Sequence, residues 1–342
     1  MPEASSERIE VIATTISGSI RDWGKVKRIV PLFAAHGFSG VTLHAAESHA
    51  AARETACAVL AAGARTIISA GGSGTFNAIL EGCCDSLVPL PEIRLGFLRK
   101  GSADLIGKTL GMPDEIEAAI AVFAAALRAD RTEPCDVLLA EDGAGVSSSR
   151  HFVGYGGAEI FGRIPHYTEN RFMKWYKGVL GQLFGDLGPF TVGMTLATAE
   201  KVLGMPFRRR RRWRIEVDGE PVAEDRFHAL IVVNGYLGPD LAFSGDALGS
   251  GRFHLFALRD RGLLRLPGQA LRARDGSIAR DPERWGMAPF AVTRSLVLAP
   301  DGDTPFPVNA DGSTLLCRGE ARFRRVDAIR LLAGAREGGA RQ

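Results

Sequence analysis

The decisive stretch of this sequence is Ile68-Ser69-Ala70-Gly71-Gly72-Ser73-Gly74-Thr75-Phe76-Asn77. The apolar run 65–70 predicts a buried strand, the glycines then turn the chain, and a helical pattern begins at Phe76. Glycine-rich turns between a strand and a helix aim several backbone N–H groups at one point, where the helix dipole also favours an anion. The stretch therefore predicts a phosphate-binding turn, and a tight turn without a ligand is the alternative.

Strands and helices alternate on both sides of this turn. The periodicity predicts strands over 9–14, 40–43 and 65–70, and helices over 23–35, 45–62 and 114–130. Such alternation is typical of a parallel sheet that is covered by helices on both faces. Ligands of these sheets bind at the carboxyl ends of the strands, which is where residues 71–75 lie.

A second segment follows, with Gly96-Phe97-Leu98-Arg99-Lys100-Gly101-Ser102-Ala103-Asp104 and then Gly107-Lys108-Thr109-Leu110-Gly111-Met112-Pro113. The two segments together resemble the diacylglycerol kinase catalytic domain, the family that includes sphingosine kinases and bacterial lipid kinases. The patterns of that family are GGDGTxNEVxNG and PLGTxNDFARxLGxP. The matching positions are Gly71, Gly72, Gly74, Thr75, Asn77, Gly82, Gly101, Leu110, Gly111 and Pro113.

Several carboxylates of the family patterns are replaced in this chain. Neutral residues stand in their place at Ser73, Ala78, Ser250 and Ser313, and a further acidic position is His254. Ser250 and His254 lie in a segment that begins at Asp246 and resembles the family's PxAxxDDGxLDV motif. Ser313 lies in a segment that resembles the family's late DGE motif. Mg²⁺ prefers oxygen ligands that include carboxylates, so the sequence leaves the metal ligands unknown.

The pattern of elements changes after residue 132, where short strand-like runs replace the alternation. These runs are 137–139, 152–155, 190–193, 214–217, 230–233, 253–257 and 295–298, with a helix around 171–184. We therefore expect an α/β fold with an N-terminal doubly wound three-layer domain (1–132), followed by a C-terminal β-sandwich domain (133–320). The resemblance implies a nucleotide cleft between them and a last segment (321–342) that returns to the first domain before a frayed tail.

The resemblance implies that the chain binds ATP, with Mg²⁺ as its companion ion. The residues it assigns to the nucleotide are Ser17, Gly18, Gly71, Gly72, Ser73, Gly74, Thr75, Asn77, Gly101, Ser102 and Asp104. Ser17-Gly18 resembles the family's NPxSG, although Thr14 and Thr15 replace its Asn-Pro. A plain loop after the first strand is the alternative for that segment.

Phosphoryl transfer also needs a group that positions the acceptor hydroxyl. Pro307-Val308-Asn309-Ala310-Asp311-Gly312-Ser313 resembles the DGE motif, whose Asp is taken as the general base, so Asp311 is the expected catalytic residue. A turn at Asp311-Gly312 is the alternative. Asp218-Gly219-Glu220 matches the same letters, but it lies between two strand-like runs and predicts a hairpin turn.

The composition is that of a folded protein with reduced cysteines and without an apolar run that could span a membrane. With 46% hydrophobic and 24% charged residues among 342, the chain is long and apolar enough for two folded domains. The five cysteines are odd in number and fit no metal or redox spacing, which favours reduced thiols. The polar N-terminus and the lack of an apolar run of about 18 residues predict a cytoplasmic protein whose membrane contact is at most peripheral.

Arg208, Arg209, Arg210, Arg211 and Arg212 precede Trp213 and form the most basic stretch of the chain. They are suited to an anionic membrane surface, with Trp213 at the interface. A solvated strand edge, where charges block pairing, is the alternative. No nucleic-acid recognition motif accompanies the stretch, so no nucleic-acid partner is expected, and a homodimer is left open.

The sequence thus favours a kinase that transfers the γ-phosphate of ATP to a diacylglycerol- or sphingoid-like lipid hydroxyl. One alternative is a nucleotide- or lipid-binding protein on the same scaffold whose catalysis is impaired. NAD kinases also carry GGDGT, and 95–98 is superficially similar to them, but the spacing of 101–113 fits the lipid kinases better. The identity of the acceptor is not readable from the sequence.

Overall fold

The computed structural model describes residues 7–14, 23–98, 105–143, 148–169, 189–204, 211–238, 241, 243–262, 265–274 and 277–334. The chain forms two compact units. The first unit comprises Met1–Cys135 and Asp327–Gln342, and the second unit comprises Asp136–Val326.

The first unit contains a parallel sheet covered on both faces. Its strand order is β2 (Val41–Ala46), β1 (Ile9–Thr14), β3 (Thr66–Ala70), β4 (Arg94–Leu98) and the end of β16 (Ala321–Leu332). Every residue of β1 and β3 is buried, as is typical of parallel strands between two helical layers. The doubly wound α/β fold that the sequence predicts is therefore confirmed.

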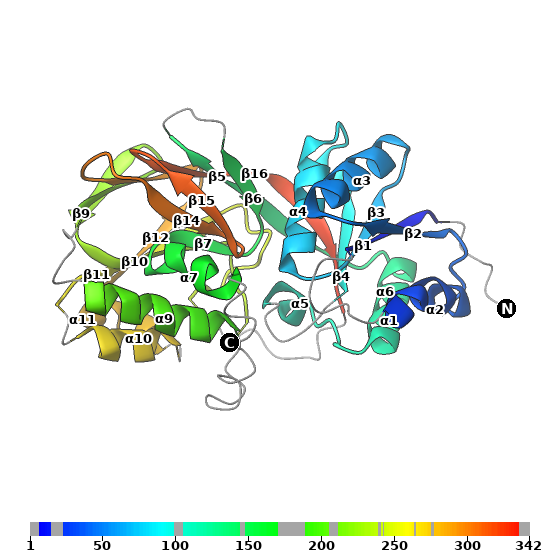
Figure 1. Ribbon diagram of the computed structural model, residues 1–342, viewed down its shortest axis with the longest axis horizontal. Helices are drawn as coiled ribbons and strands as arrows, with labels where there is room; N and C mark the ends of the chain where they lie inside the picture. The colour runs from blue at the N-terminus through cyan, green and yellow to red at the C-terminus, as the bar shows by residue number, and fades with distance from the viewer. Residues whose placement is uncertain are drawn as a thin grey trace. The chain divides into compact units, whose positions relative to one another are not determined.

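Two groups of helices provide the covering layers. They are α1 (Trp23–Lys27), α2 (Ile29–Ala35), α3 (His49–Ala61), α4 (Ser73–Asp85), α5 (Leu105–Thr109) and α6 (Ile116–Arg128), with the 3-10 helix η1 (Leu90–Glu92). Helix α3 packs on α4, and α2 packs on α6. Figure 1 shows the first pair on one side of the sheet and α1, α2 and α6 on the other.

Two boundaries in this unit differ from the sequence prediction. The helix expected over 23–35 is divided at Arg28, because Pro31 has no N–H to donate to the carbonyl of Lys27 and the run of helical hydrogen bonds is interrupted there. Strand β2 extends to Ala46, and α3 begins only after Ser48, whose hydroxyl caps the helix by accepting the Ala51 N–H at 3.0 Å.

The second unit contains two sheets of antiparallel strands. One sheet has the order β12 (Met287–Val292), β11 (Phe253–Arg259), β10 (Phe227–Val233), β7 (Tyr155–Glu159), β14 (Phe306–Ala310) and β15 (Ser313–Cys317). The other joins β9 (Glu220–Asp225), β8 (Trp213–Val217), β13 (Ser295–Pro300) and the start of β16, with β5 (Thr132–Asp142) and β6 (Ser149–Phe152) beside them.

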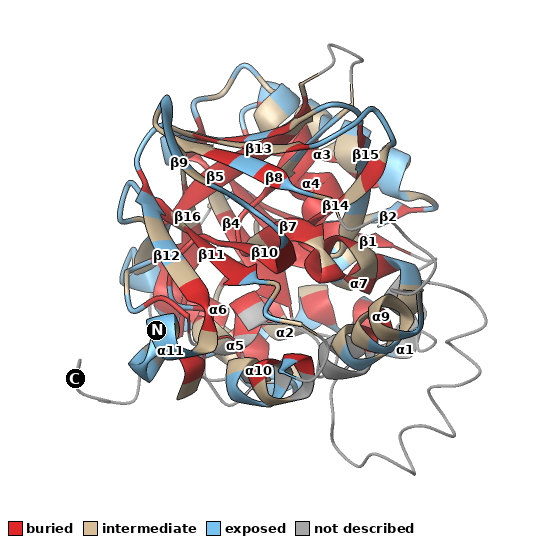
Figure 2. Cartoon of the chain, turned by 90° about the vertical axis from the view of Figure 1, so that its left-hand side faces the viewer, coloured by how far each residue is buried: buried red, intermediate tan, exposed pale blue. Residues whose placement is uncertain are grey.

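One core fills the space between these sheets. Phe253 and Leu230 enter it from one sheet, and Trp213 and Phe323 enter it from the other. Figure 2 shows the buried residues running along the strands, whereas β9 is largely exposed. This packing of two sheets face to face is the C-terminal β-sandwich that the sequence predicts.

The helices of the second unit include one at a place where the sequence predicts a strand. They are α7 (Ile160–Glu169), α9 (Pro189–Gly204), α10 (Leu266–Arg274) and α11 (Pro282–Trp285), with the 3-10 helix η3 (Ser277–Arg280). The strand predicted over 190–193 is wrong, because these residues belong to α9. Pro189 suits the first position of a helix, and α9 packs against α7, so that tertiary contact outweighs the strand propensity of Phe190 and Val192. The helix expected around 171–184 lies outside the described residues.

Strand β16 contributes to both units. Its first residues pair with β13, and Arg330 and Leu331 near its end pair with Arg94 and Leu95 of β4. Within the first unit, Arg330 also bonds Asp130 at 2.8 Å, and the Gly334 N–H donates to the Leu110 carbonyl at 2.8 Å. The last part of β16 is thus an integral part of the first sheet.

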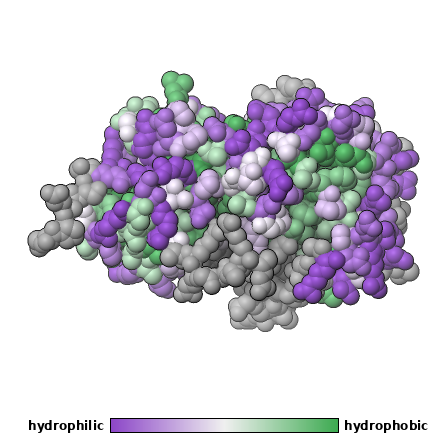
Figure 3. Space-filling model, turned by 180° about the vertical axis from the view of Figure 1, so that it is seen from behind, coloured by the Kyte–Doolittle hydropathy of each residue, from purple (hydrophilic) through white to green (hydrophobic). Residues whose placement is uncertain are grey.

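The visible surface is mostly hydrophilic. Figure 3 shows hydrophobic residues there in smaller areas between hydrophilic ones. The exposed large apolar side chains of the described residues, such as Leu87, Leu203 and Leu316, come from different elements. No helix in the described parts of the chain is long and apolar enough to cross a bilayer.

Candidate functional site

The strand order of the first unit defines where a ligand is expected. After β1 the chain crosses to β2 on one side, and β3 lies on the other side of β1. The connections that follow β1 and β3 therefore leave in opposite directions, which opens a crevice at the carboxyl ends of these two strands. Thr14 ends β1 there, Ala70 ends β3, and Gly71 comes directly after Ala70.

The first turn of α4 faces this point. Gly72 is its N-cap, with φ −85° and ψ −175°, and no side chain caps the helix. The carbonyl of Gly72 accepts the first helical bonds, from the N–H groups of Thr75 and Phe76. The N–H groups of Ser73 and Gly74 precede these bonds, and the first turn holds no acidic residue, so the positive end of the helix is not neutralised.

A buried hydroxyl pair fixes the turn to the sheet. The Thr14 and Thr75 hydroxyl oxygens lie 2.6 Å apart, and both residues are fully buried. Gly71 passes so close to this pair that a Cβ on it would lie 2.3 Å from the Thr75 hydroxyl oxygen. A Cβ on Gly72, by contrast, would have open space around it. The turn is therefore rigid on the Gly71 side and open on the Gly72 side.

We expect Gly71→Ala to destabilise the protein and Gly72→Ala to leave it nearly unchanged. The methyl group at position 71 must displace Thr75 and break its bond to Thr14, and overpacking of this kind costs about 1–3 kcal/mol. Urea unfolding of both variants measures the difference. Equal stabilities would contradict this account of the turn.

The remaining glycines and polar residues of α4 have different roles. Gly82 allows close packing with α3, because a Cβ there would lie 2.3 Å from the Arg53 carbonyl oxygen. A Cβ on Gly74 would lie 2.8 Å from the imidazole of His49, at the start of α3. The side chain of Ser73 is exposed, and Asn77 is buried within α4. Gly82 is thus a packing residue, whereas residues 71–75 form the open turn.

Several expected nucleotide contacts cannot be placed. Ser17, Gly18, Gly101, Ser102 and Asp104 lie outside the described residues. The described residues of the turn are Gly71, Gly72, Ser73, Gly74, Thr75 and Asn77, which the structure brings together at the start of α4. Within the described ranges, no group of three or more His, Cys, Asp and Glu side chains could hold a metal ion.

Asp311, the expected general base, lies in the second unit. It begins the tight turn between β14 and β15, with φ +45°, and Gly312 follows with φ +86°. Its carboxylate accepts three backbone N–H groups, from Val153 at 2.8 Å, Gly154 at 3.0 Å and Tyr155 at 2.7 Å. Asp311 is therefore both a turn residue and a buried carboxylate.

The environment of this carboxylate sets its basicity. Burial raises the pKa of Asp311, while the N–H groups of Tyr155, Val153 and Gly154 oppose the rise by stabilising the ionised form. The carboxylate is therefore a buried proton acceptor whose ionised form is stabilised by backbone N–H groups.

Asp218 has a structural role, as the sequence predicts. It forms the hairpin turn between β8 and β9, with φ +55°, and Gly219 follows with φ +93°. Its carboxylate accepts bonds from Thr293, Arg294 and Ser295. Although partial burial opposes ionisation, these bonds lower the pKa of Asp218 to about 2. The carboxylate thus fixes the turn that precedes β13.

The segment that resembles the family's second acidic motif is also held by internal bonds. His254 lies in β11, as expected of a strand residue, and its Nε2 is 2.8 Å from a carboxylate oxygen of Asp246. Arg252 bonds the same carboxylate at 2.6 Å and is the main reason that the pKa of Asp246 is lowered. The Ser250 hydroxyl donates to the Arg252 carbonyl. Asp246 is therefore engaged by two basic side chains.

Sequence reasoning missed two residues of the turn. Thr14 appears in the sequence only as a replacement within a loop motif, and His49 carries no motif at all. Their proximity to Thr75 and Gly74 depends on the pairing of β1 with β3 and the packing of α3 on α4. The only sequence signal was their position at the end of a strand and at the start of a helix, on the carboxyl edge of the sheet.

Comparison with known proteins identifies relatives of this fold. Residues 8–139 match the family model of the diacylglycerol kinase catalytic domain. A diacylglycerol kinase from Bacillus anthracis str. Sterne has a similar structure, with a TM-score of 0.64 and 17% identity over 96% of this chain and 97% of its own. At this identity the likeness shows the fold.

Two further structures from the same strain, each named a candidate diacylglycerol kinase, are also similar. One has a TM-score of 0.68 and 16% identity over 96% of this chain and 98% of its own. The other has a TM-score of 0.68 and 17% identity over 96% of this chain and 97% of its own. No curated protein sequence matches the chain.

Proposed function

This chain carries a domain of the diacylglycerol kinase catalytic-domain family, and we propose that it transfers the γ-phosphate of ATP to the hydroxyl group of a lipid. The family supports a lipid-kinase type of function. The observation that carries the proposal is the open first turn of α4 at the crevice between β1 and β3, where Gly72 leaves space for an anion.

In this proposal the donor phosphates bind the N–H groups of Ser73 and Gly74. Those groups belong to the positive end of α4, and the rigid pair of Thr14 and Thr75 holds them in place. Ser17, Gly18, Gly101, Ser102 and Asp104 are proposed as further contacts. Because the turn is held before any ligand arrives, little conformational entropy is lost on binding.

We assign the general base to Asp311. The acceptor hydroxyl would donate a hydrogen bond to its carboxylate. As the hydroxyl oxygen attacks the γ-phosphorus, the bond from that phosphorus to ADP breaks, and the proton passes to Asp311. The buried carboxylate suits this role because its raised pKa makes it a stronger base than an exposed aspartate.

Mg²⁺ fits the described residues less well than the phosphates do. The first turn of α4 holds no acidic residue, and Ser73 supplies only a neutral hydroxyl there. We therefore assign no residue to the metal. An ion that accompanies ATP would be held mostly by the phosphates themselves and by water.

The test of the proposal is phosphate transfer from ATP to defined lipids. Purified protein is incubated with γ-labelled ATP, with and without Mg²⁺, and with diacylglycerol, a sphingoid base or no lipid. We expect a labelled lipid product in at least one arm. Binding of ATP without a product from a broad lipid panel would favour the second candidate.

The second candidate is a protein that binds nucleotide or lipid on this scaffold but catalyses poorly. The first turn of α4 favours it, because no acidic residue there could help to organise a metal ion. In that case the same turn would still bind phosphate. The two candidate functions differ only in catalytic turnover, so a measurement of ATP binding alone does not separate them.

We expect Ser73→Asp to strengthen the dependence of turnover on Mg²⁺ and to raise the rate. A carboxylate at this exposed position adds a charged oxygen ligand beside the donor phosphates, whereas the hydroxyl is neutral. Ser73→Asn, which is similar in size but neutral, is the matched control. If the wild type already turns over at about 1–100 s⁻¹ and Ser73→Asp slows it, the argument from the missing carboxylate is wrong.

The basic stretch 208–212 and Trp213 differ in their surroundings. Trp213 is fully buried and donates its indole N–H to Glu159, so it does not reach a membrane interface. Arg208, Arg209 and Arg210 lie outside the described residues, and Arg212 is exposed beside Glu224. Arg211, the fifth arginine of the stretch, donates to the Pro305 carbonyl and stacks over Phe306. We propose that the other four arginines, Arg208, Arg209, Arg210 and Arg212, attract the protein to anionic lipid surfaces.

Replacing these four arginines by glutamine should release the protein from vesicles that contain anionic lipid. Each basic side chain near such a surface contributes about 1 kcal/mol, and salt screens the attraction. Co-sedimentation at low and high salt measures the effect, with vesicles of neutral lipid as the control. If neither salt nor the substitutions changed vesicle binding, contact between these arginines and anionic lipid would be excluded.

A further inference from the structure

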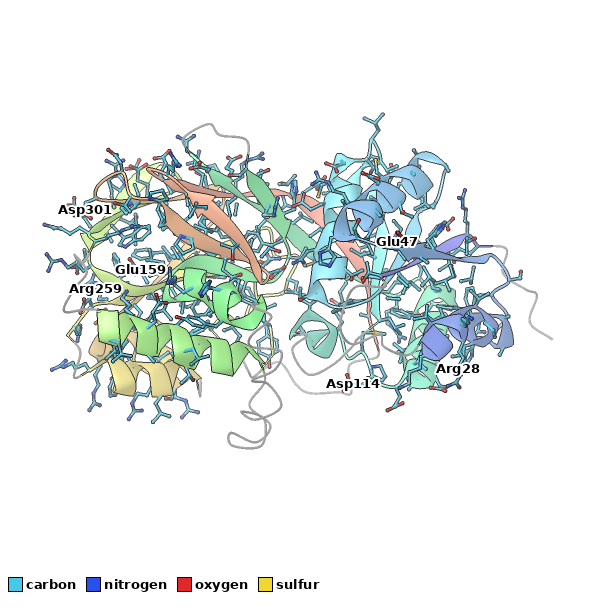
Figure 4. All side chains as sticks on the ribbon, in the orientation of Figure 1. Arg28, Glu47, Asp114, Glu159, Arg259 and Asp301 are labelled. Atoms are coloured by element: carbon cyan, nitrogen blue, oxygen red, sulfur yellow. The ribbon has the colours of Figure 1, made fainter. Side chains whose placement is uncertain are left out.

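The second unit contains a cavity that the proposed phosphate transfer does not use. Its volume is about 650 Å³, within the range of sites for small molecules. It lies between α7 and α9, the end of β7, the starts of β8, β10 and β14, and the loop that precedes β14. Figure 4 shows two of its lining residues, Glu159 and Asp301, toward the same end of the second unit.

Apolar side chains form one part of the wall. Trp213 and Phe306 meet edge to face, with ring centroids 5.0 Å apart, and Phe227, Ile160 and Ala197 complete this part. A ligand that enters the cavity would therefore place an apolar body against them.

Most charges of the lining neutralise one another. Glu159 accepts the Trp213 indole N–H at 2.7 Å and the Lys201 ammonium at 2.7 Å. Lys201 uses its two other donors on the carbonyls of Phe227 and His228. The Glu200 carboxylate is bonded by both Arg163 and the Tyr167 hydroxyl. These pairs leave few donors or acceptors for a ligand.

The backbone at Glu159 is strained. Its φ is +61°, in the left-handed region that residues other than glycine seldom adopt. The bonds from Lys201 and Trp213 hold it there. Strain that is maintained by its surroundings in this way is common at binding sites.

Two arginines of the lining have no carboxylate partner within the described residues. Arg211 donates to the Pro305 carbonyl and stacks over Phe306, and Arg226 is exposed. The two remaining carboxylates are engaged, because Asp301 accepts the Arg212 N–H at 2.9 Å and Asp260 accepts the Gly262 N–H at 2.9 Å. Among the cationic side chains of the lining, Arg163 and Lys201 are thus paired with carboxylates, whereas Arg211 and Arg226 have no such partner in the described part of the chain.

We propose that this cavity is a binding site for an anionic amphiphile. The apolar wall would hold its hydrocarbon body, and Arg211 and Arg226 would bind a carboxylate or phosphate head group. Carboxylate and phosphate share this chemistry, and the experiment separates them. The proposal does not depend on kinase activity.

The experiment is calorimetric titration of the full chain with octanoate, octyl phosphate, octan-1-ol and inorganic phosphate. Octanoate, octyl phosphate or both should bind at least about tenfold more tightly than octan-1-ol, and inorganic phosphate should bind more weakly than octyl phosphate. Arg211→Gln and Arg226→Gln should each lower the affinity of the preferred amphiphile by about tenfold, the effect of one charge-assisted bond.

Two matched variants locate the effect. Arg280→Gln removes the same charge from an exposed residue outside the lining, and it should leave the affinity unchanged. Gly72→Leu alters the turn of the first unit, and it should also leave the affinity unchanged. The proposal would be overturned if octan-1-ol bound as tightly as octanoate and octyl phosphate, or if inorganic phosphate bound as tightly as octyl phosphate. Full affinity for the amphiphile in both arginine variants would also overturn it.

Discussion

Asp311→Asn should lower the rate of lipid phosphorylation by about 10²- to 10⁴-fold, the range for the loss of a general base. The amide cannot take up the proton that the attacking hydroxyl must lose. Steady-state kinetics with ATP and a lipid acceptor measure the effect. The ionised carboxylate is the active form, so the wild-type rate should fall as the pH drops through its pKa. Because burial raises that pKa, the fall should begin above the range of an exposed aspartate.

This substitution also affects stability, which its controls must separate from catalysis. Asparagine offers one acceptor oxygen to the N–H groups of Val153, Gly154 and Tyr155, and each donor left unpaired costs about 1–3 kcal/mol. Measured ATP affinity should persist, because the turn of α4 lies in the other unit. Asp218→Asn should leave turnover unchanged. A larger loss of turnover at Asp218 than at Asp311 would reverse the assignment.

Gly72→Leu should abolish detectable ATP binding without unfolding the protein. The backbone of Gly72 is extended and has open space around it, so the fold tolerates a side chain there. The same space lies before the N–H groups of Ser73 and Gly74, and leucine would fill it with a hydrocarbon group that repels phosphate by desolvation. Calorimetry with ATP measures the loss.

Two controls define this result. Gly72→Ala adds only a methyl group and should retain part of the affinity. Thermal unfolding of Gly72→Leu should match the wild type within the small changes expected at a surface position. A leucine variant that binds ATP with unchanged affinity would show that the turn does not bind phosphate.

The alternation of strands and helices made the first unit predictable from its sequence. The buried strands β1 and β3 are predominantly apolar, and the glycines at 71, 72 and 74 mark the turn between β3 and α4. Local signals of this kind depend on neighbouring residues alone. The position of the turn at the edge of the sheet then follows from the parallel topology.

Long-range contacts were not predictable in the same way. The Thr14–Thr75 pair joins residues far apart in the sequence, and no local pattern marks it. The strand propensity of Phe190 and Val192 is a local signal that α9 overrides by packing on α7. Trp213 beside a run of arginines suggested a membrane interface, but alternation within β8 directs it into the core.

Strand β16 has a consequence for the order in which the protein can fold as it is made. The ribosome adds residue 327 only after it has synthesised the whole of the second unit. Until then β4 has an unpaired edge, which can pair wrongly with another chain. The first unit therefore stays incomplete during synthesis until residues 327–332 have been translated. A transcript truncated before that point would leave the second unit whole and the first unit prone to aggregation.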